Sequence, residues 1–284
     1  MRLNGITTII ASLMLAAPLY AQTPEAAAPI IPAEVSQPAV SVAPEPVKPE
    51  VATGPAKVVF DTSHGEIFSP VKKGPLHYSN FTTSIKKTGA KVSMNAEAIS
   101  LKTLEGVDTY IIAGPSKPVS RDEIAALSIF VENGGNLLVL MHISPPVAQL
   151  TESFGILVSN FVIAEHEGTI KGKSQDFYVT KLAEHPVTAG VGKIAVFGSW
   201  ALMTEGSASV VASTSEKAWM DLNRNRAFDH GEPIQSYGIV AAASSGAGKV
   251  VVVADDAPFA NKFMKEAGNM RLAGNIMSWF SAKK

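Results

Sequence analysis

The stretch Asp108–His142 constrains the fold of this chain more than any other part. It contains two continuous apolar runs of strand length, 109–113 and 137–141, which is the pattern of strands buried on both faces of a parallel sheet. Between the runs, Ser120–Glu123 has the spacing of a helix capping box, and Gly134–Gly135 is suited to end the helix. Two parallel strands joined by a helix form a right-handed crossover, so this stretch predicts an α/β domain.

Strands and helices are expected to alternate before this stretch as well. With strand Lys57–Asp61, helix Tyr78–Thr88 and strand Lys91–Met94, we predict the order strand–helix–strand–helix–strand–helix–strand of a doubly wound sheet. After His142 short strands dominate. We predict there a short helix at 146–154, irregular chain or a short strand within 155–163, strands at 177–180, 195–197, 210–213 and 218–220, a β-hairpin of 237–243 with 249–254, and a closing helix at about 269–280.

The N-terminal part of the chain has the composition of a targeting segment and a spacer. Residues 1–21 are predicted to be a secretory signal peptide, because Arg2 precedes the apolar run Ile6–Ala17. An uncleaved anchor is the alternative, but the run is shorter than the roughly 20 residues of a spanning helix. Residues 22–56 are rich in Pro and Ala and are predicted to be a disordered linker ahead of one domain, 57–284. We therefore expect a periplasmic or secreted protein with no transmembrane segment after cleavage.

Composition excludes several classes of function. The chain has no cysteine, so disulfides, a lipid-modified cysteine and thiol catalysis are excluded. Its formal net charge is −1, and no long basic run is present, which argues against a nucleic-acid partner.

Several short motifs follow one another in a characteristic order. They are Asp61–Glu66, Tyr110–Pro115, Gly134–Leu140, His185–Val191, Gly248–Asp255 and Asn269–Phe280. In this order they resemble the GIFT-type branch of the class I glutamine amidotransferase-like superfamily. Within it, they are similar to the uncharacterised bacterial members that lack the catalytic cysteine. The branch includes the N-terminal domain of an intraflagellar-transport protein. The resemblance implies a flavodoxin-like fold, and no particular activity follows from it.

Amidotransferases of that superfamily carry their cysteine on a sharp turn after a sheet strand, and the corresponding place here is His142–Pro146. Ser144 is the one hydroxyl nucleophile in this segment. A nucleophile elbow lends the amide of the next residue to the oxyanion hole, and Pro145 has no amide. We therefore expect a proline-capped loop that opens the next helix, and no serine catalysis.

Acidic and histidine side chains follow several of the predicted strands. They are Asp61, His64, Glu66, His142, Asp255 and Asp256. In a parallel sheet the ends of these strands meet at the carboxyl edge, where open α/β sheets bind ligands. Histidines and carboxylates can hold a divalent metal ion or transfer protons, so the sequence predicts a ligand site at this edge. The alternative is that these residues only cap helices and close turns.

The segment 221–232 has the spacing of a calcium-binding loop. Oxygen ligands are available from Asp221, Asn223, Asn225, Ala227 (through its carbonyl), Asp229 and Glu232. These are positions 1, 3, 5, 7, 9 and 12 of an EF-hand loop. Arg226 stands where such loops have glycine, and the flanking residues read as strands instead of helices. We predict a weak calcium site, with a polar hairpin tip that binds no ion as the alternative.

Together these features predict a binding or scaffold domain rather than an enzyme. The domain would be exported, would carry a structural calcium ion, and would bind a protein or saccharide partner in the cell envelope. The alternative is a hydrolase that uses a metal ion or an acid–base pair at the carboxyl edge of the sheet.

Overall fold

The computed structural model describes residues 54–282. The predicted signal peptide and nearly all of the predicted linker lie outside this range. The strands are β1 Lys57–Asp61, β2 Lys91–Asn95, β3 Thr109–Ala113, β4 Asn136–Leu140, β5 Ile156–Ala164, β6 Thr169–Ile170, β7 Lys173–Val179, β8 Lys181–Leu182, β9 Ile194–Phe197, β10 Trp200–Thr204, β11 Ser209–Ser213, β12 Trp219–Met220, β13 Gly238–Ser245 and β14 Gly248–Val253. The α-helices are α1 Ser79–Lys87, α2 Arg121–Glu132, α3 Ala148–Glu152 and α4 Asn269–Ser281, and the 3₁₀ turns are η1 Pro145–Val147, η2 Pro186–Thr188 and η3 Ala257–Phe259. None of the helices in 54–282 has the length and apolar character needed to cross a membrane.

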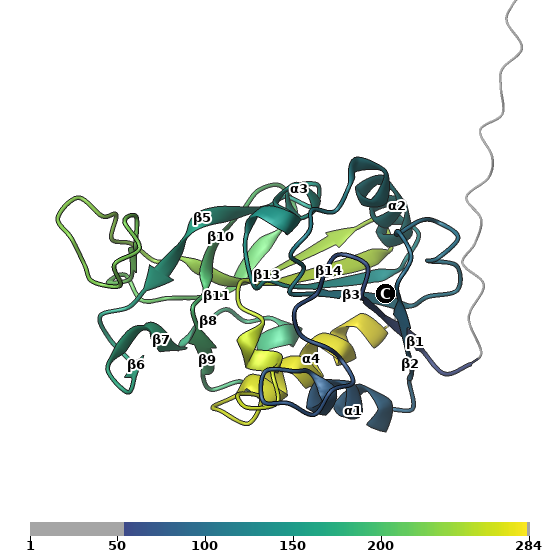
Figure 1. The fold of residues 1–284 in the computed structure, drawn as a ribbon, viewed down its shortest axis with the longest axis horizontal. Helices are drawn as coiled ribbons and strands as arrows, with labels where there is room; N and C mark the ends of the chain where they lie inside the picture. Colours follow the sequence, from purple (N-terminus) through teal and green to yellow (C-terminus); the bar gives the residue numbers. More distant parts are fainter. Residues whose placement is uncertain (1–53, 283–284) are drawn as a thin grey trace, which may run out of the picture. The chain divides into compact units, whose positions relative to one another are not determined.

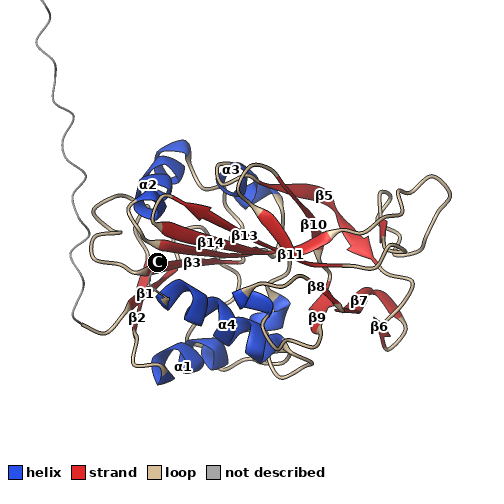
Figure 2. Cartoon of the chain, turned by 180° about the vertical axis from the view of Figure 1, so that it is seen from behind, coloured by secondary structure: helices blue, strands red, loops and turns tan. Residues whose placement is uncertain are grey.

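A large mixed sheet forms the centre of the domain (Figures 1 and 2). Its order is β12-β5-β10-β13-β14-β4-β3-β1-β2, with β11 paired to β13 and β8 paired to β11. The pairings from β2 to β14 are parallel, and the remaining ones are antiparallel. A second, three-stranded sheet has the order β6-β7-β9. The α/β class is therefore confirmed. The large sheet is mostly antiparallel, because the strands that follow β4 make only antiparallel pairs apart from the pair of β14 with β4.

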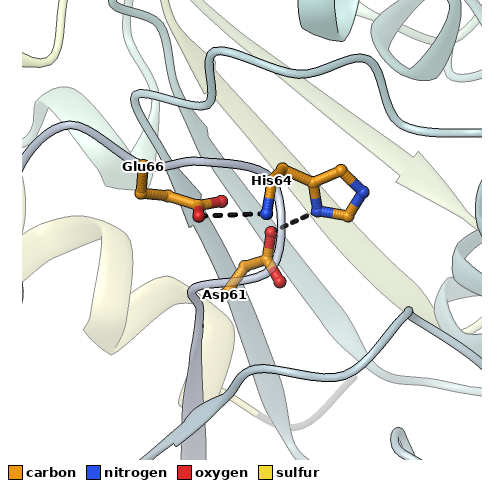
Figure 3. Close-up of side chains that lie close together, drawn as sticks. All are labelled: Asp61, His64 and Glu66. Atoms are coloured by element: carbon orange, nitrogen blue, oxygen red, sulfur yellow. Dashed lines mark hydrogen bonds and ion pairs between the residues drawn. The ribbon is translucent and has the colours of Figure 1, made fainter.

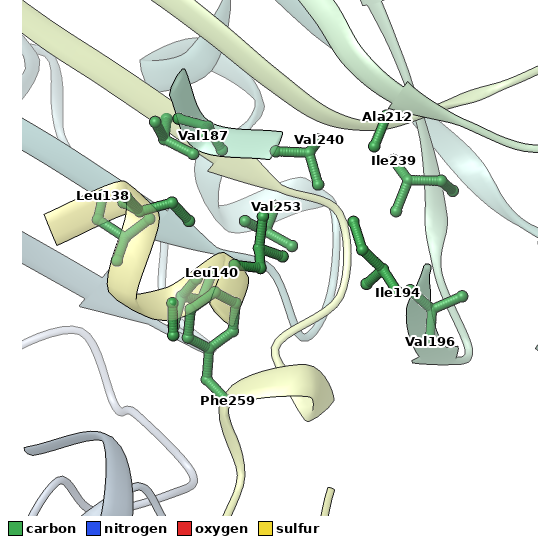
Figure 4. Packing of buried hydrophobic residues seen from close by; sticks show 14 of the residues in the cluster. Leu138, Leu140, Val187, Ile194, Val196, Ala212, Ile239, Val240, Val253 and Phe259 are labelled. Atoms are coloured by element: carbon green, nitrogen blue, oxygen red, sulfur yellow. The ribbon is translucent and has the colours of Figure 1, made fainter. Parts of the chain in front are cut away.

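Helices cover both faces of the parallel strands (Figure 2). Because successive side chains of a strand point to opposite faces, β4 contributes Leu138 and Leu140 to one core and Leu137 and Val139 to the other. The first core also receives side chains of α1 and α4, and the second those of α2 and α3. Figure 4 shows part of the first core, including Leu138, Leu140 and Phe259. Burial on both faces explains why these strands are continuous apolar runs.

The crossover predicted from the sequence is present in full. Ser120 accepts a hydrogen bond from the backbone N–H of Glu123, and the Glu123 carboxylate accepts one from the backbone N–H of Ser120. The helix ends ahead of Gly134, which has a φ of 105°, a conformation that glycine adopts without strain. The hairpin of β13 with β14 is also confirmed.

Two local predictions are wrong. The segment between β2 and β3 contains turns and no helix, because hydrogen bonds between Ser100 and Thr103 fold it tightly. The irregular chain or short strand expected within 155–163 is instead part of the nine-residue strand β5. Polar residues at the centre of β5 interrupt the apolar pattern typical of a strand. One of them, Ser159, accepts a hydrogen bond from the backbone N–H of Ala201 where the β5–β10 register shifts.

Candidate functional site

The six residues predicted at the carboxyl edge form two separate groups. Asp61, His64 and Glu66 follow β1 and are called the Asp61 cluster here. His142 follows β4, and Asp255 and Asp256 follow β14; these three are called the His142 cluster. Hydrogen bonds link side chains within each group.

The Asp61 cluster is held together by short hydrogen bonds (Figure 3). The Nδ1 atom of His64 lies 2.6 Å from Oδ2 of Asp61, and the backbone N–H of His64 donates to Oε2 of Glu66 at 3.1 Å. The other ring nitrogen, Nε2, lies 3.2 Å from Oε2 of Glu123. His64 is only 5% exposed and Asp61 only 2%, so this is an interior network.

These contacts determine the protonation states of the side chains in the Asp61 cluster. Burial lowers the pKa of His64, but the hydrogen bonds and negative charges of Asp61 and Glu123 outweigh it and raise that pKa to about 9. Burial would raise the pKa of Asp61, yet its bond with His64 and the charge of His64 lower it. Burial, and then Asp61, raise the pKa of Glu66 to about 8. At neutral pH the cluster holds a protonated His64, an ionised Asp61 and a neutral Glu66.

Two residues that contact this cluster were not predicted from the sequence. Glu123 is recognisable as a capping residue, but its carboxylate also reaches His64. Tyr110 reads as a core residue of β3, and its hydroxyl donates to Oδ1 of Asp61 at 2.9 Å. A signal for Glu123 existed, because α2 follows β3 and begins at the same edge of the sheet.

The His142 cluster joins the ends of β4 and β14. The Nδ1 atom of His142 lies 3.3 Å from Oδ1 of Asp256, whose Oδ2 accepts a hydrogen bond from the Tyr78 hydroxyl at 2.6 Å. The bond to Asp256 raises the pKa of His142, against the opposing effect of burial. Asp255 accepts hydrogen bonds from the backbone N–H groups of Phe197 and Ala257. Its burial, together with the charge of Asp256, raises its pKa to about 7.

A pocket of about 620 Å³ opens beside the His142 cluster. His142, Asp255 and Asp256 line it from the large sheet, while Tyr178 and Phe197 line it from the small sheet. The two carboxylates are buried, and the Lys171, Lys173 and Lys262 side chains that also line the pocket belong to exposed residues. The Phe197 and Phe263 rings stack at 3.9 Å between centroids. The pocket thus combines acceptors, aromatic faces and cations.

Ser144 lies just before η1 and is fully buried. Its hydroxyl has no hydrogen-bond partner within residues 54–282. Pro145 begins the 3₁₀ turn, so the proline-capped loop expected from the sequence is present. A side chain without access to solvent cannot attack a substrate from the pocket.

The predicted calcium loop is a polar loop closed by its own hydrogen bonds. The two carboxylate oxygens of Asp221 accept from the backbone N–H groups of Asn225 and Arg226, at 3.1 and 3.0 Å. Glu232 accepts from two further backbone N–H groups, and the side-chain amide of Asn223 donates to Asp229 at 2.6 Å. Arg226 has a φ of 66°, the conformation that glycine has at this position of an EF-hand loop. Asn225 and Ala227 lie on the same exposed turn.

Comparison with known proteins identifies one family model that matches the chain. It is described as "Domain of unknown function (DUF4350)" and matches residues 72–277. None of the curated proteins compared with the chain matches it.

Solved structures with a similar fold share little sequence identity with the chain. The "mmIFT52 N-terminal domain" has a TM-score of 0.66 at 17% identity, covering 80% of this chain and 98% of its own. A cytoplasmic protein of Salmonella typhimurium LT2 has a TM-score of 0.53 at 14% identity, covering 80% and 100%. A putative ThuA-like protein from Bacteroides uniformis ATCC 8492 has a TM-score of 0.48 at 14% identity, covering 83% and 96%.

The family match corrects the resemblance drawn from short motifs. The chain matches DUF4350 and no glutamine amidotransferase family, so placing it in the amidotransferase-like superfamily is wrong. The motifs behind that placement are buried strands with the turns beside them, the 3₁₀ turn η2 and the helix α4. Such features reflect the packing of a parallel sheet, and they recur in families that are otherwise distinct.

Proposed function

Because the chain belongs to the DUF4350 family, whose description assigns no activity, we propose its function from the site: a non-enzymatic binding domain that holds a saccharide in the pocket beside His142. We further propose that the domain is exported, as the N-terminal segment predicts, and that its ligand belongs to the cell envelope. A protein partner at the same edge of the sheet is the alternative ligand.

The observation that carries this proposal is the position of the pocket. We infer a flavodoxin-like core from the parallel order β2-β1-β3-β4-β14, and in such sheets ligands bind beyond the carboxyl ends of the strands. The pocket lies there, beside the residues that follow β4 and β14. Its volume falls within the roughly 300–1,000 Å³ typical of small-molecule sites. Buried carboxylates beside aromatic faces suit a ligand with many hydroxyl groups.

Binding of neutral oligosaccharides tests this proposal. We expect a panel of β-linked glucose and N-acetylglucosamine tetramers to include a ligand detectable by calorimetry. His142→Ala should weaken that ligand at least about tenfold, because one lost hydrogen bond to a charged group corresponds to about 1.5 kcal/mol or more. His166→Ala is the matched control, since His166 is exposed and lies outside the pocket. Equal binding by both variants would contradict the proposal.

A hydrolase is the second candidate, and one observation favours it. Nδ1 of His142 is oriented by Asp256, while Nε2 has no hydrogen-bond partner in the described part of the chain and the residue lines the pocket. A histidine oriented by a carboxylate in this way can act as a general base toward water. Release of shorter saccharides from the same tetramers, abolished by His142→Ala, would favour the hydrolase over the binding domain.

We also propose that the 221–232 loop binds calcium, on the strength of its ligand spacing and the left-handed φ of Arg226. At millimolar calcium the melting temperature should rise by about 4 °C, because an ion that binds only the folded state stabilises it. Asp229→Asn should remove most of this shift, and the same concentration of magnesium should not reproduce it. An unchanged melting temperature in calcium would show that the loop is a polar turn closed by its own hydrogen bonds.

A further inference from the structure

We propose that the Asp61 cluster binds one divalent transition-metal ion of the zinc type. Asp61, His64 and Glu66 each offer one ligand atom, and these atoms all lie within 4.8 Å of one another. Within residues 54–282 they are the one such group of three histidine or acidic side chains. The site is distinct from the pocket of the proposed function, since none of the three residues lines that pocket.

The donor set fits zinc better than calcium. One imidazole nitrogen and two carboxylate oxygens are ligands that zinc accepts in tetrahedral sites, whereas calcium takes six to eight oxygens. Figure 3 shows Nδ1 of His64 turned toward the Asp61 carboxylate, with Glu66 on the side of the His64 backbone. Around an ion with bonds of about 2.0–2.2 Å, tetrahedral ligand atoms lie about 3.3–3.6 Å apart. Side-chain shifts of about 1 Å would bring the three donors to that spacing.

Glu123 supplies a second observation. Its carboxylate lies 3.2 Å from Nε2 of His64, so Nε2 can keep its proton there while the ion displaces the proton that Nδ1 shares with Asp61. Metal-bound histidines usually have such an outer carboxylate, which fixes both the tautomer and the ring orientation. Glu123 is itself fixed at the first turn of α2 by the capping box.

Glu66 supplies a third observation. Its Oε1 atom is buried and has no hydrogen-bond partner among the described residues, although Oε2 accepts the backbone N–H of His64. A buried oxygen without a partner is costly, and a cation in the cluster would satisfy it. Three protein donors would leave the fourth position of a tetrahedral ion to a water molecule, in a cluster whose Asp61 and His64 are almost fully buried. The role of the ion would be to join the loop after β1 to the start of α2.

Zinc loading of the full chain, purified without a histidine tag and stripped with chelator, tests this inference. After gel filtration we expect close to one zinc per chain and a melting temperature raised by about 5 °C or more. Glu66→Gln should weaken zinc binding at least about tenfold, because a carboxyl group can release its proton to become an anionic ligand, whereas an amide of the same shape stays neutral. Glu105→Gln is the matched control, since Glu105 is exposed and lies outside the cluster; it should bind zinc like the wild type.

Cobalt(II) provides a readout that needs no variant. In a tetrahedral site it has strong visible absorption, which zinc should displace from the wild-type chain. Asp229→Asn should leave both metals bound, which separates this site from the 221–232 loop. Zinc and cobalt that remain unbound at about 100 µM would show that the cluster is an ion pair only. If Glu66→Gln binds zinc as tightly as the wild type does, the proposed site is also wrong.

Discussion

Replacing Gly248 with alanine should lower the free energy of unfolding by about 3 kcal/mol, the upper part of the range for overpacking a core. Gly248 begins β14, and a Cβ atom there would lie 2.1 Å from the carbonyl oxygen of Gly135 and 2.2 Å from that of Val131. Both atoms are backbone, held by the end of α2 and the start of β4, so neither can move away as a flexible side chain would. The midpoint of urea unfolding measures the effect.

Gly274→Ala is the matched control for this change. Gly274 lies on the exposed face of α4, and a Cβ atom there would meet no atom within 4 Å. Alanine is favoured over glycine inside a helix by about 0.5–1 kcal/mol, so this variant should be more stable than the wild type. Similar stability of the two variants would contradict the close packing of β14 against α2 and β4.

The second large effect concerns Asp255 and depends on pH. Burial and the charge of Asp256 raise the pKa of Asp255 from 3.8 to about 7 in the folded state. Between these values the folded protein keeps a proton that the unfolded chain releases. The contribution of Asp255 to the free energy of unfolding is therefore fully present below pH 3.8. It falls by on the order of 4 kcal/mol as the pH rises to 7.

Asp255→Asn isolates this effect, because asparagine is neutral at every pH. The variant loses one acceptor for the backbone N–H groups of Phe197 and Ala257, so we expect it to be less stable than the wild type near pH 4. The difference should shrink or reverse by pH 8, where the wild type carries a buried charge. Unfolding of both proteins in urea at several pH values measures it. Asp122→Asn makes the same chemical change at an exposed position. A difference that stays constant from pH 4 to 8 would contradict the raised pKa.

Local signals in the sequence predicted the local structure well. The boundaries of β1 and β3 follow from apolar runs, and those of α2 follow from Ser120 and the Gly134 turn. Such signals depend on neighbours within a few residues, which the sequence displays directly. The β5 strand was not recognised in full because polar residues interrupt its apolar pattern. These residues lie where the pairing with β10 shifts register, and that pairing is a property of both strands and not of β5 alone.

The candidate site was predicted only in part, because its contacts connect distant segments. The sequence places Asp61, His64 and His142 after strands, but it does not show that Glu123 meets His64 or that Tyr78 meets Asp256. Those pairs depend on the order of strands in the sheet. The wall that the small β6-β7-β9 sheet contributes to the pocket is likewise a tertiary feature, since its short strands carry no sign of where they pack.

The place of β14 in the sheet has a consequence for how this chain folds. β14 follows all the other described strands in the chain, yet it pairs with β4 on one side and β13 on the other, in the middle of the large sheet. Until the chain has been synthesised to residue 253, one edge of β4 is unpaired. The parallel and antiparallel halves of the sheet also lack the strand that joins them. Contacts between such distant segments slow folding, and open edges attract other strands. The large sheet should therefore stay incomplete, with its two halves apart, until β14 has been synthesised.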